Sequence, residues 1–241
     1  EMGRAEKASV DEVLLRVAER RYGASAAAPV VKAWKAYSEA FQEFPYAGAL
    51  VYRAPLQMGP ANPLWAESTG YGASMVGLPY DDLEGWRAGF PVDVFIGQFE
   101  KIAQGFNQAL ASLKKALAGR AIEAEQAATL AREMDVAQAC AIHFQSVANQ
   151  ARFVHMRQAL AHAKSAQQAQ EPLETLERVL NTEMRLAIQL HAIQQRDSRI
   201  GFEGSNHYFY VPADLVAKVI NCRHLLDHWL PRERAKHRDK L

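Results

Sequence analysis

Apolar residues recur at intervals of three and four along most of this chain, as they do on one face of an α-helix. Three long series have this spacing: one after Pro91, one over about 122–164 and one after Pro172. Near-heptad rows joined by short connections favour antiparallel packing, so we expect an all-α, up-down bundle of long helices. The rows are Phe95, Phe99, Ile102, Phe106, Leu110, Leu113 and Leu117; then Leu130, Met134, Ala137, Ala141, Phe144, Ala148 and Ala151; then Leu173, Leu176, Leu180, Ala187 and Leu190.

Local signals predict where the remaining helices begin and end. Ser9 followed by Glu12 is a capping-box pattern, and the helix that it begins should end at Gly23. Pro29 suits the first turn of a second helix, and Pro212 opens a last helix that we expect Pro231 to close. The basic tail RERAKHRDKL is expected to be a solvated, fraying end.

Residues 45–91 differ from the rest of the chain because they are rich in Gly and Pro and also in aromatic and aliphatic residues. Loops in compact domains are typically about 4 to 6 residues long, so a connection of this length and apolarity must be covered. It is expected to fold over its own domain or to pack against another one. The prediction is one helical domain, 1–241, with a helical pair at 9–43, an aromatic insertion at 44–91 and a long-helix bundle at 92–230.

Composition excludes some classes of partner. The 28 basic and 27 acidic residues leave a net charge of +1, which gives no reason to expect a nucleic-acid or membrane surface. The sequence has no run of about 20 apolar residues, as a membrane-spanning helix would need. Cys140 and Cys222 lie far apart within helical patterns, so buried free thiols are expected rather than a disulfide. The start at Glu1 predicts a fragment of a longer protein.

Motifs for metals, nucleotides and nucleophilic catalysis are missing from the sequence, and we therefore expect no cofactor. A di-metal carboxylate centre in a bundle needs Glu-x-x-His pairs, and the sequence contains none. His224 and His228 have a spacing that can chelate a metal. Leu225 and Trp229 beside them indicate a half-buried face, so a packed or capping histidine pair is preferred to a metal site.

Glu183 is a carboxylate on the apolar row of its predicted helix, where it needs a partner. The preceding helix offers HFQSVANQARF, which contains His143, Ser146, Asn149, Gln150 and Arg152. A buried hydrogen-bonded network is the preferred interpretation, and a catalytic acid inside the bundle is the alternative. If the network exists, Glu183→Ala should cost about 1 to 3 kcal/mol of stability, because it would orphan buried partners.

The segment DSRIGFEGSNHYFY, residues 197–210, interrupts the helices with acidic, amide, histidine and aromatic side chains. Asp197, Glu203 and His207 could form a general acid and base set. The same mixture is typical of a carbohydrate subsite, and it would also suit an ordinary loop anchored by its tyrosines. These three interpretations stay open. We also expect residues 45–91 and 197–210 to lie on one side of the bundle and to form its functional face.

Residues 18–41, AERRYGASAAAPVVKAWKAYSEAF, resemble the start of the C-terminal helical domain in large bacterial glycoside hydrolases of the α-glucuronidase and α-N-acetylglucosaminidase type. An Arg-Tyr-Gly turn precedes an Ala-Trp helix there, and the matching residues are Arg21, Tyr22, Gly23, Ala33 and Trp34. Further stretches similar to bacterial proteins with a sugar-hydrolase-like N-terminal region are GPANPLW, MVGLPYDDLEGWR, HFQSVANQARF and DSRIGFEGSNHYFY.

The resemblance implies that the chemistry resides on an N-terminal barrel that this chain lacks, so no residue is expected to be catalytic and the isolated chain should have no glycosidase activity. It implies a non-catalytic helical domain that packs against that barrel, with carbohydrate as the expected ligand. A free-standing helical interaction or small-ligand-binding module is the alternative. Coding sequence for several βα units upstream of Glu1 would favour the first, and an open reading frame starting at Met2 the second. The expected substrate-binding residues are Trp65, Tyr80, Asp81, Asp82, Trp86, Glu203, Asn206, His207 and Tyr208.

Overall fold

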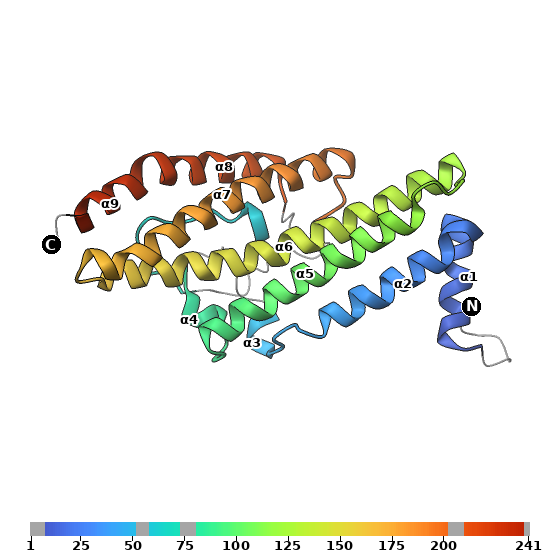
Figure 1. Cartoon of the computed structure of the whole chain (residues 1–241), viewed down its shortest axis with the longest axis horizontal. Coiled ribbons are helices and arrows are strands. Elements are labelled where there is room, and N and C mark those ends of the chain that lie inside the picture. Colours follow the sequence, from blue (N-terminus) through green and yellow to red (C-terminus); the bar gives the residue numbers. More distant parts are fainter. Residues whose placement is uncertain (1–7, 52–57, 73–80, 202–209, 239–241) are drawn as a thin grey trace. The chain divides into compact units, whose positions relative to one another are not determined.

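The computed structural model describes residues 8–51, 58–72, 81–201 and 210–238, and these ranges form an all-α helical bundle (Figure 1). This confirms the predicted fold class. None of the helices in these ranges combines the length and the apolar character needed to cross a membrane. The main helices are α1 (Val10–Tyr22), α2 (Ala24–Phe41), α5 (Val92–Leu117), α6 (Ala124–His162), α7 (Ala166–Arg196), α8 (Pro212–His224), η2 (Leu225–Trp229) and α9 (Leu230–Arg238). Short turns of helix are α3 (Gly48–Val51), η1 (Gly59–Ala61) and α4 (Leu83–Trp86).

The chain divides into two compact units, and the first comprises residues 1–43 and 101–141. It contains α1, α2, the second part of α5 and the first part of α6. The buried faces of these segments form one apolar core, and small residues dominate the α2 side of that core. The core residues are Ala18, Tyr22, Ala26, Ala27, Val30, Ala33, Leu113 and Leu130.

The second unit comprises residues 44–100 and 142–241. It contains the remaining parts of α5 and α6 together with α7, α8, η2 and α9. Helices α7 and α8 run antiparallel and pack along each other (Figure 1). Most residues of the rows predicted from the sequence are buried, and Leu117, Met134 and Phe144 are partly buried. Ala148 and Ala151 on α6 and Leu176 and Leu180 on α7 are among the buried residues of this unit.

Two helices begin earlier than their prolines predicted. The capping box of Ser9 and Glu12 and the end of α1 before Gly23 are confirmed, but α2 starts at Ala24 and places Pro29 inside the helix. Pro29 has no N–H for the carbonyl of Ser25 four residues back, and the Arg120 guanidinium donates to that carbonyl at 2.7 Å instead. Helix α7 likewise begins at Ala166, capped by Ser165, and includes Pro172.

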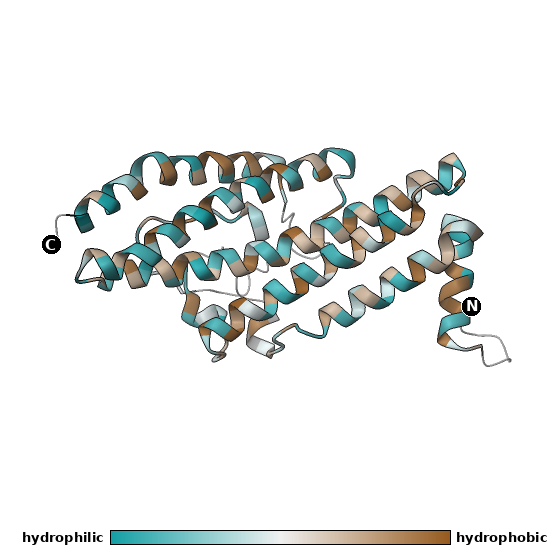
Figure 2. Ribbon diagram, in the orientation of Figure 1, coloured by the Kyte–Doolittle hydropathy of each residue, from teal (hydrophilic) through white to brown (hydrophobic). Residues whose placement is uncertain are grey.

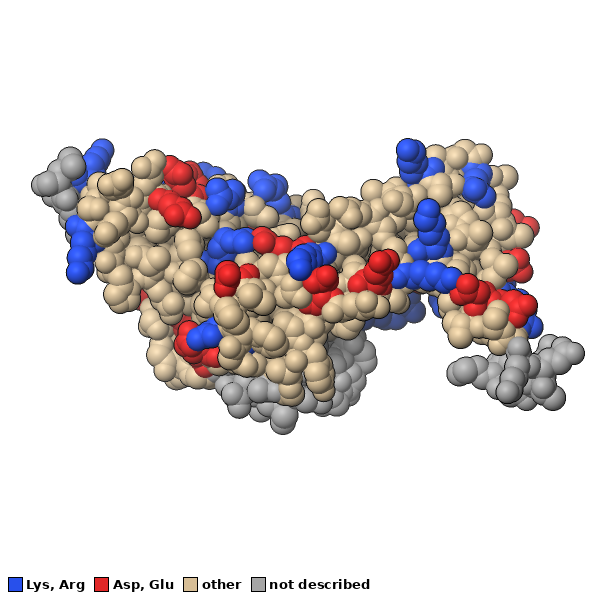
Figure 3. All heavy atoms as spheres, turned by 60° about the horizontal axis from the view of Figure 1, so that its bottom comes forward, with Lys and Arg blue, Asp and Glu red and all other residues tan. Residues whose placement is uncertain are grey.

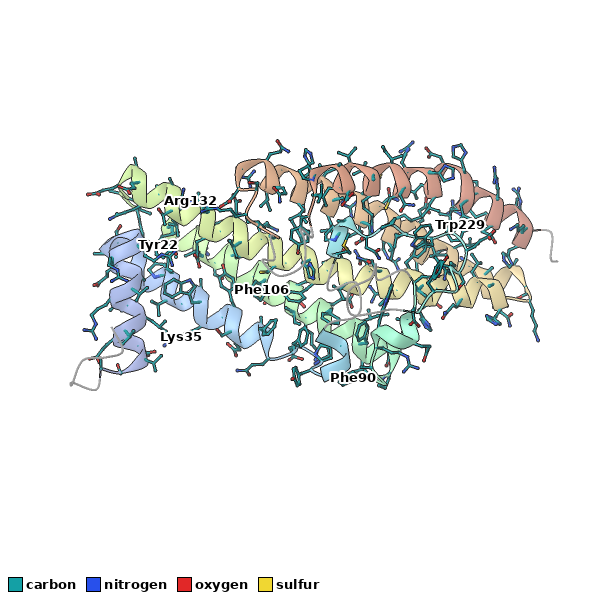
Figure 4. The ribbon with its side chains drawn as sticks, turned by 180° about the vertical axis from the view of Figure 1, so that it is seen from behind. Tyr22, Lys35, Phe90, Phe106, Arg132 and Trp229 are labelled. Carbon is teal, nitrogen blue, oxygen red and sulfur yellow. The ribbon has the colours of Figure 1, made fainter. Side chains whose placement is uncertain are left out.

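The end predicted at Pro231 is wrong, because the helical chain continues to Arg238. Residues Leu225–Trp229 form a π turn in which the Leu230 N–H donates to the Leu225 carbonyl. The wider turn accommodates a proline that would otherwise clash with the preceding turn. The same turn carries Trp229, which is labelled in Figure 4. The centroid of its ring lies 5.8 Å from that of the Phe153 ring.

The prediction of a fraying tail is wrong for the part that the structure describes, which is helical up to Arg238. Leu230 and His237 are buried, and the Arg234 guanidinium pairs with Glu177 on α7 at 2.5 Å. Elsewhere on the surface, Lys and Arg side chains are interspersed with Asp and Glu on the face shown in Figure 3, in keeping with the small net charge.

Candidate functional site

Glu183 is the centre of a buried polar cluster in the second unit, and this confirms the predicted network. Its side chain is wholly buried. The Ser146 hydroxyl donates to one carboxylate oxygen at 2.8 Å, and the Asn149 amide donates to the other at 2.9 Å. Both donors come from the segment of α6 that the sequence indicated.

Lys218 of α8 completes this cluster, and the sequence interpretation missed it. Its ammonium lies 2.9 Å from Glu183 Oε2, and both side chains have 0% exposure. A signal was present, because Lys218 falls on the apolar row formed by Leu215, Cys222 and Leu225, just as Glu183 falls on the row of α7. Two opposite charges on the apolar rows of consecutive helices indicate a buried pair.

The cluster also holds the backbone of residues 59–64. Lys218 donates to the Asn62 carbonyl at 2.5 Å, and Gln150 donates to the Gly59 carbonyl at 2.7 Å. Asn221 makes a two-way bond with Leu64, accepting from its N–H at 2.8 Å and donating to its carbonyl at 2.9 Å. Side chains of α6 and α8 therefore supply the hydrogen-bond partners for backbone groups of residues 59–64 that a helix or a sheet would otherwise provide.

Arg157 of α6 holds the next stretch. Its guanidinium donates to the carbonyls of Trp65 at 2.6 Å and Glu67 at 3.0 Å, and it pairs with Asp81 at 2.5 Å. Thr69 donates to Asp81 through both its N–H and its hydroxyl. Burial acts to raise the pKa of Asp81, but the bonds from Thr69 and Arg157 outweigh it and hold this pKa below its ordinary value.

The loop of residues 65–72, hereafter the aromatic loop, exposes two rings. Trp65 is 38% exposed and Tyr71 is 63% exposed. The contacts of Arg157, Asp81 and Thr69 fix the backbone between them. The two rings of the aromatic loop are therefore exposed, while buried side chains hold its backbone in place.

The other predicted binding residues have different environments. Asp81 and Trp86 are both buried, and Asp81 pairs with Arg157. Their contact with a substrate stays a prediction. Asp82 caps α4 by accepting from the Gly85 N–H at 3.0 Å. The remaining residues lie outside the described ranges: Tyr80, Glu203, Asn206, His207 and Tyr208.

The described parts of the predicted insertion, 44–51, 58–72 and 81–91, pack on their own unit. Met58, Leu64, Leu83 and Trp86 are all buried there. This is one of the two arrangements that its apolar composition allowed.

Two segments predicted to share a face approach each other at His143. The Tyr210 hydroxyl lies 2.5 Å from His143 Nδ1, and a Cβ added to Gly59 would lie 2.5 Å from the same nitrogen. The separation of Trp86 and His207 would test the shared face, but His207 lies outside the described ranges, so the shared face stays a prediction.

The residues that carry the family resemblance have structural roles in the first unit. The Tyr22 hydroxyl and the Trp34 indole N–H both donate to the Glu133 carboxylate at 2.8 Å. Gly23 has a φ of 83°, a value that L side chains rarely adopt. The Arg-Tyr-Gly turn and the Ala-Trp helix thus join α1 and α2 to α6 within this unit.

The two cysteines were predicted to be buried free thiols. Both cysteines are free; Cys222 is buried and Cys140 half-buried. Burial raises the pKa of the Cys222 thiol to about 12.

His224 and His228 are both exposed, so the half-buried face predicted for this pair from the neighbouring Leu225 and Trp229 is wrong.

No protein-family model, curated protein or solved structure matches this chain. Within the described ranges, no three His, Cys, Asp or Glu side chains gather as a group that could hold a metal ion. The site must therefore be interpreted from its own geometry.

Proposed function

We propose that this chain is a non-catalytic helical domain of a carbohydrate-active, glycoside-hydrolase-like protein, and that its aromatic loop contacts the sugar. The observation that carries the proposal is the exposure of Trp65 and Tyr71 on a backbone held by buried side chains. Aromatic rings pack against the apolar faces of sugars, and neighbouring polar groups bind the hydroxyls. Glu67 and Ser68, both exposed, supply such groups within the same loop.

The fixed backbone supports binding for a thermodynamic reason. Ordering a loop on association costs free energy, about 0.5 to 1.5 kcal/mol for each immobilised side chain and more for backbone. Arg157 and Asn221 order residues 64–67 before any ligand arrives. Because this loop is already ordered, a weak stacking contact with a ligand loses less free energy to ordering than the same contact on a flexible loop would.

The non-catalytic part of the proposal rests on the state of the buried carboxylates. Glycoside hydrolysis ordinarily uses two carboxyl groups about 5 to 10 Å apart that flank the scissile bond. Glu183 is wholly buried and shared among Ser146, Asn149 and Lys218, and Asp81 is buried against Arg157. Neither carboxylate can reach a sugar without dismantling the cluster that holds it. We expect the purified chain to release no product from aryl-glycosides.

The test is a titration of the chain with defined oligosaccharides, glucuronoxylan fragments and chitohexaose, followed by calorimetry and by nuclear magnetic resonance. Saturable binding with a dissociation constant below about 1 mM is expected. Trp65→Ala should abolish it, whereas Tyr46→Ala should not, because Tyr46 is exposed but lies outside the aromatic loop. Equal affinity in both variants, or no binding to either glycan, would overturn the proposal.

The alternative, a helical interaction module, is favoured by a separate apolar strip on α7 and α8. Ile188, Val216 and Ile220 are 56%, 48% and 64% exposed, and Figure 2 shows apolar residues along α8. A shallow groove of about 220 Å³ lies there, bordered by Leu215 and His191. If the chain works as this module, Ile220→Asp should abolish co-purification with a partner and leave the glycan titration unchanged. Loss of glycan affinity in this variant would count against the alternative.

A further inference from the structure

Two histidines on adjoining turns of α8 and η2 present their rings to each other on the outside of the second unit. The ring centroids of His224 and His228 are 4.9 Å apart with planes inclined at 49°. Both side chains are exposed. We propose that this pair binds one divalent transition-metal ion that prefers imidazole ligands, such as Zn²⁺.

The separation of the rings fits shared coordination. A metal–nitrogen distance of about 2.0 to 2.1 Å places each ring centroid roughly 3.2 Å from the ion. Two such ligands at angles of about 90° to 109° then have centroids roughly 4.5 to 5.2 Å apart. The observed 4.9 Å lies within this range. The separation of the two rings is therefore compatible with a shared ion.

The local backbone explains this arrangement. In an α-helix, a residue four positions ahead lies slightly beyond one full turn of 3.6 residues. The π turn at Leu225–Trp229 holds more residues per turn, so the register between His224 and His228 differs from that of a regular helix. Buried Leu225 and Cys222 fix the inner face of the same segment. The histidines are consequently directed outward from a turn that ends two residues before Pro231.

The basic residue next to His224 in the sequence is already paired with a carboxylate. Arg223 precedes His224, and its guanidinium donates to Asp227 Oδ2 at 2.7 Å, so the basic charge next to the pair is matched by a carboxylate. The two side chains are 66% and 43% exposed, and solvent screens them further. Two imidazoles leave the remaining coordination positions to water. The site therefore binds an exchangeable ion and differs from a closed structural zinc site.

The experiment measures Zn²⁺ binding to the full chain by isothermal titration calorimetry, with inductively coupled plasma analysis of the dialysed protein. We expect one ion per chain with a dissociation constant on the order of 1 to 100 µM, far weaker than a four-ligand site. His224→Ala and His228→Ala should each weaken binding at least tenfold, since each removes half of the protein ligands. His162→Ala is the matched control, because His162 is exposed at the end of α6, away from the pair in sequence.

Each outcome decides the proposal. Wild-type affinity in either single variant, or Zn²⁺ uptake that persists in the double variant, would place the ion elsewhere and overturn it. No saturable uptake by the wild-type chain below 1 mM would also overturn it. Circular dichroism of every variant verifies folding, which exposed positions should leave unchanged. The result is independent of the carbohydrate proposal, because the aromatic loop contributes no ligand.

Discussion

Replacing Lys218 with methionine tests whether the buried ion pair organises the second unit. The substitution keeps an unbranched chain in the core but removes the ammonium that contacts Glu183 at 2.9 Å and the Asn62 carbonyl at 2.5 Å. The Glu183 carboxylate would stay buried with only Ser146 and Asn149 as donors. Removal of one partner of a buried pair typically costs about 3 to 5 kcal/mol. Because the buried Lys218 ammonium would lose its counter-charge and keep only the Asn62 carbonyl, Glu183→Ala should cost as much, and more than the about 1 to 3 kcal/mol predicted from the sequence.

A double-mutant cycle in urea separates this cost from ordinary loss of packing. Lys218→Met, Glu183→Leu and the double variant would be unfolded with helicity followed by circular dichroism, and equal m-values would show that one transition is compared. The double variant should be more stable than either single variant, with a coupling of at least about 2 kcal/mol. Single variants that lose less than about 1 kcal/mol, or costs that simply add, would refute the ion-pair argument.

Three further predictions concern single residues. Burial raises the pKa of Tyr37 to about 12, so the stability that its neutral phenol contributes is fully present below about pH 10 and is lost as the pH rises through about 12. Urea unfolding at a series of pH values should show this loss. Cys222, with its raised pKa and burial, should react with Ellman's reagent only when the chain unfolds. Gly59→Ala should cost about 1 to 2 kcal/mol in thermal unfolding, because φ is 49° and His143 blocks the Cβ; Gly89→Ala, with a φ of 87° and nothing near its Cβ, controls for strain alone.

Most of the helical architecture could be predicted from the sequence because apolar periodicity reflects which face each helix buries. Helix ends were harder to predict wherever a proline was involved. Pro29 and Pro231 both lie inside helices, and each is tolerated for a reason that local sequence does not display. Arg120, far along the chain, satisfies the carbonyl that Pro29 leaves free, and a π turn accommodates Pro231.

Part of the candidate site could be predicted from the sequence, and the rest could not because it depends on contacts between residues far apart in the chain. Glu183 stood out because a carboxylate on an apolar row must find a partner, and the partners on α6 were close in the expected register. The aromatic loop was harder, since its residues look alike in composition whether they are buried or exposed. Trp65 and Trp86 have the same side chain, but only contacts distant in sequence, such as Arg157 with the Trp65 carbonyl, determine which one faces solvent.

The way in which residues 59–67 are held has a consequence for how such a loop can diverge. Arg157, Gln150 and Lys218 bind carbonyl oxygens, and every amino acid has one. The side chains that fix the path of the loop therefore make few contacts with the loop's own side chains. Many loop residues could be substituted, or the loop grafted, without changing the path of its backbone. The residues that cannot change freely are those on the helices. A change from Arg157 to lysine would remove the guanidinium that contacts two carbonyls and Asp81 at the same time. Relatives of this chain, when aligned, should vary more at 66–68 than at these helix positions or at Thr69, whose hydroxyl donates to Asp81.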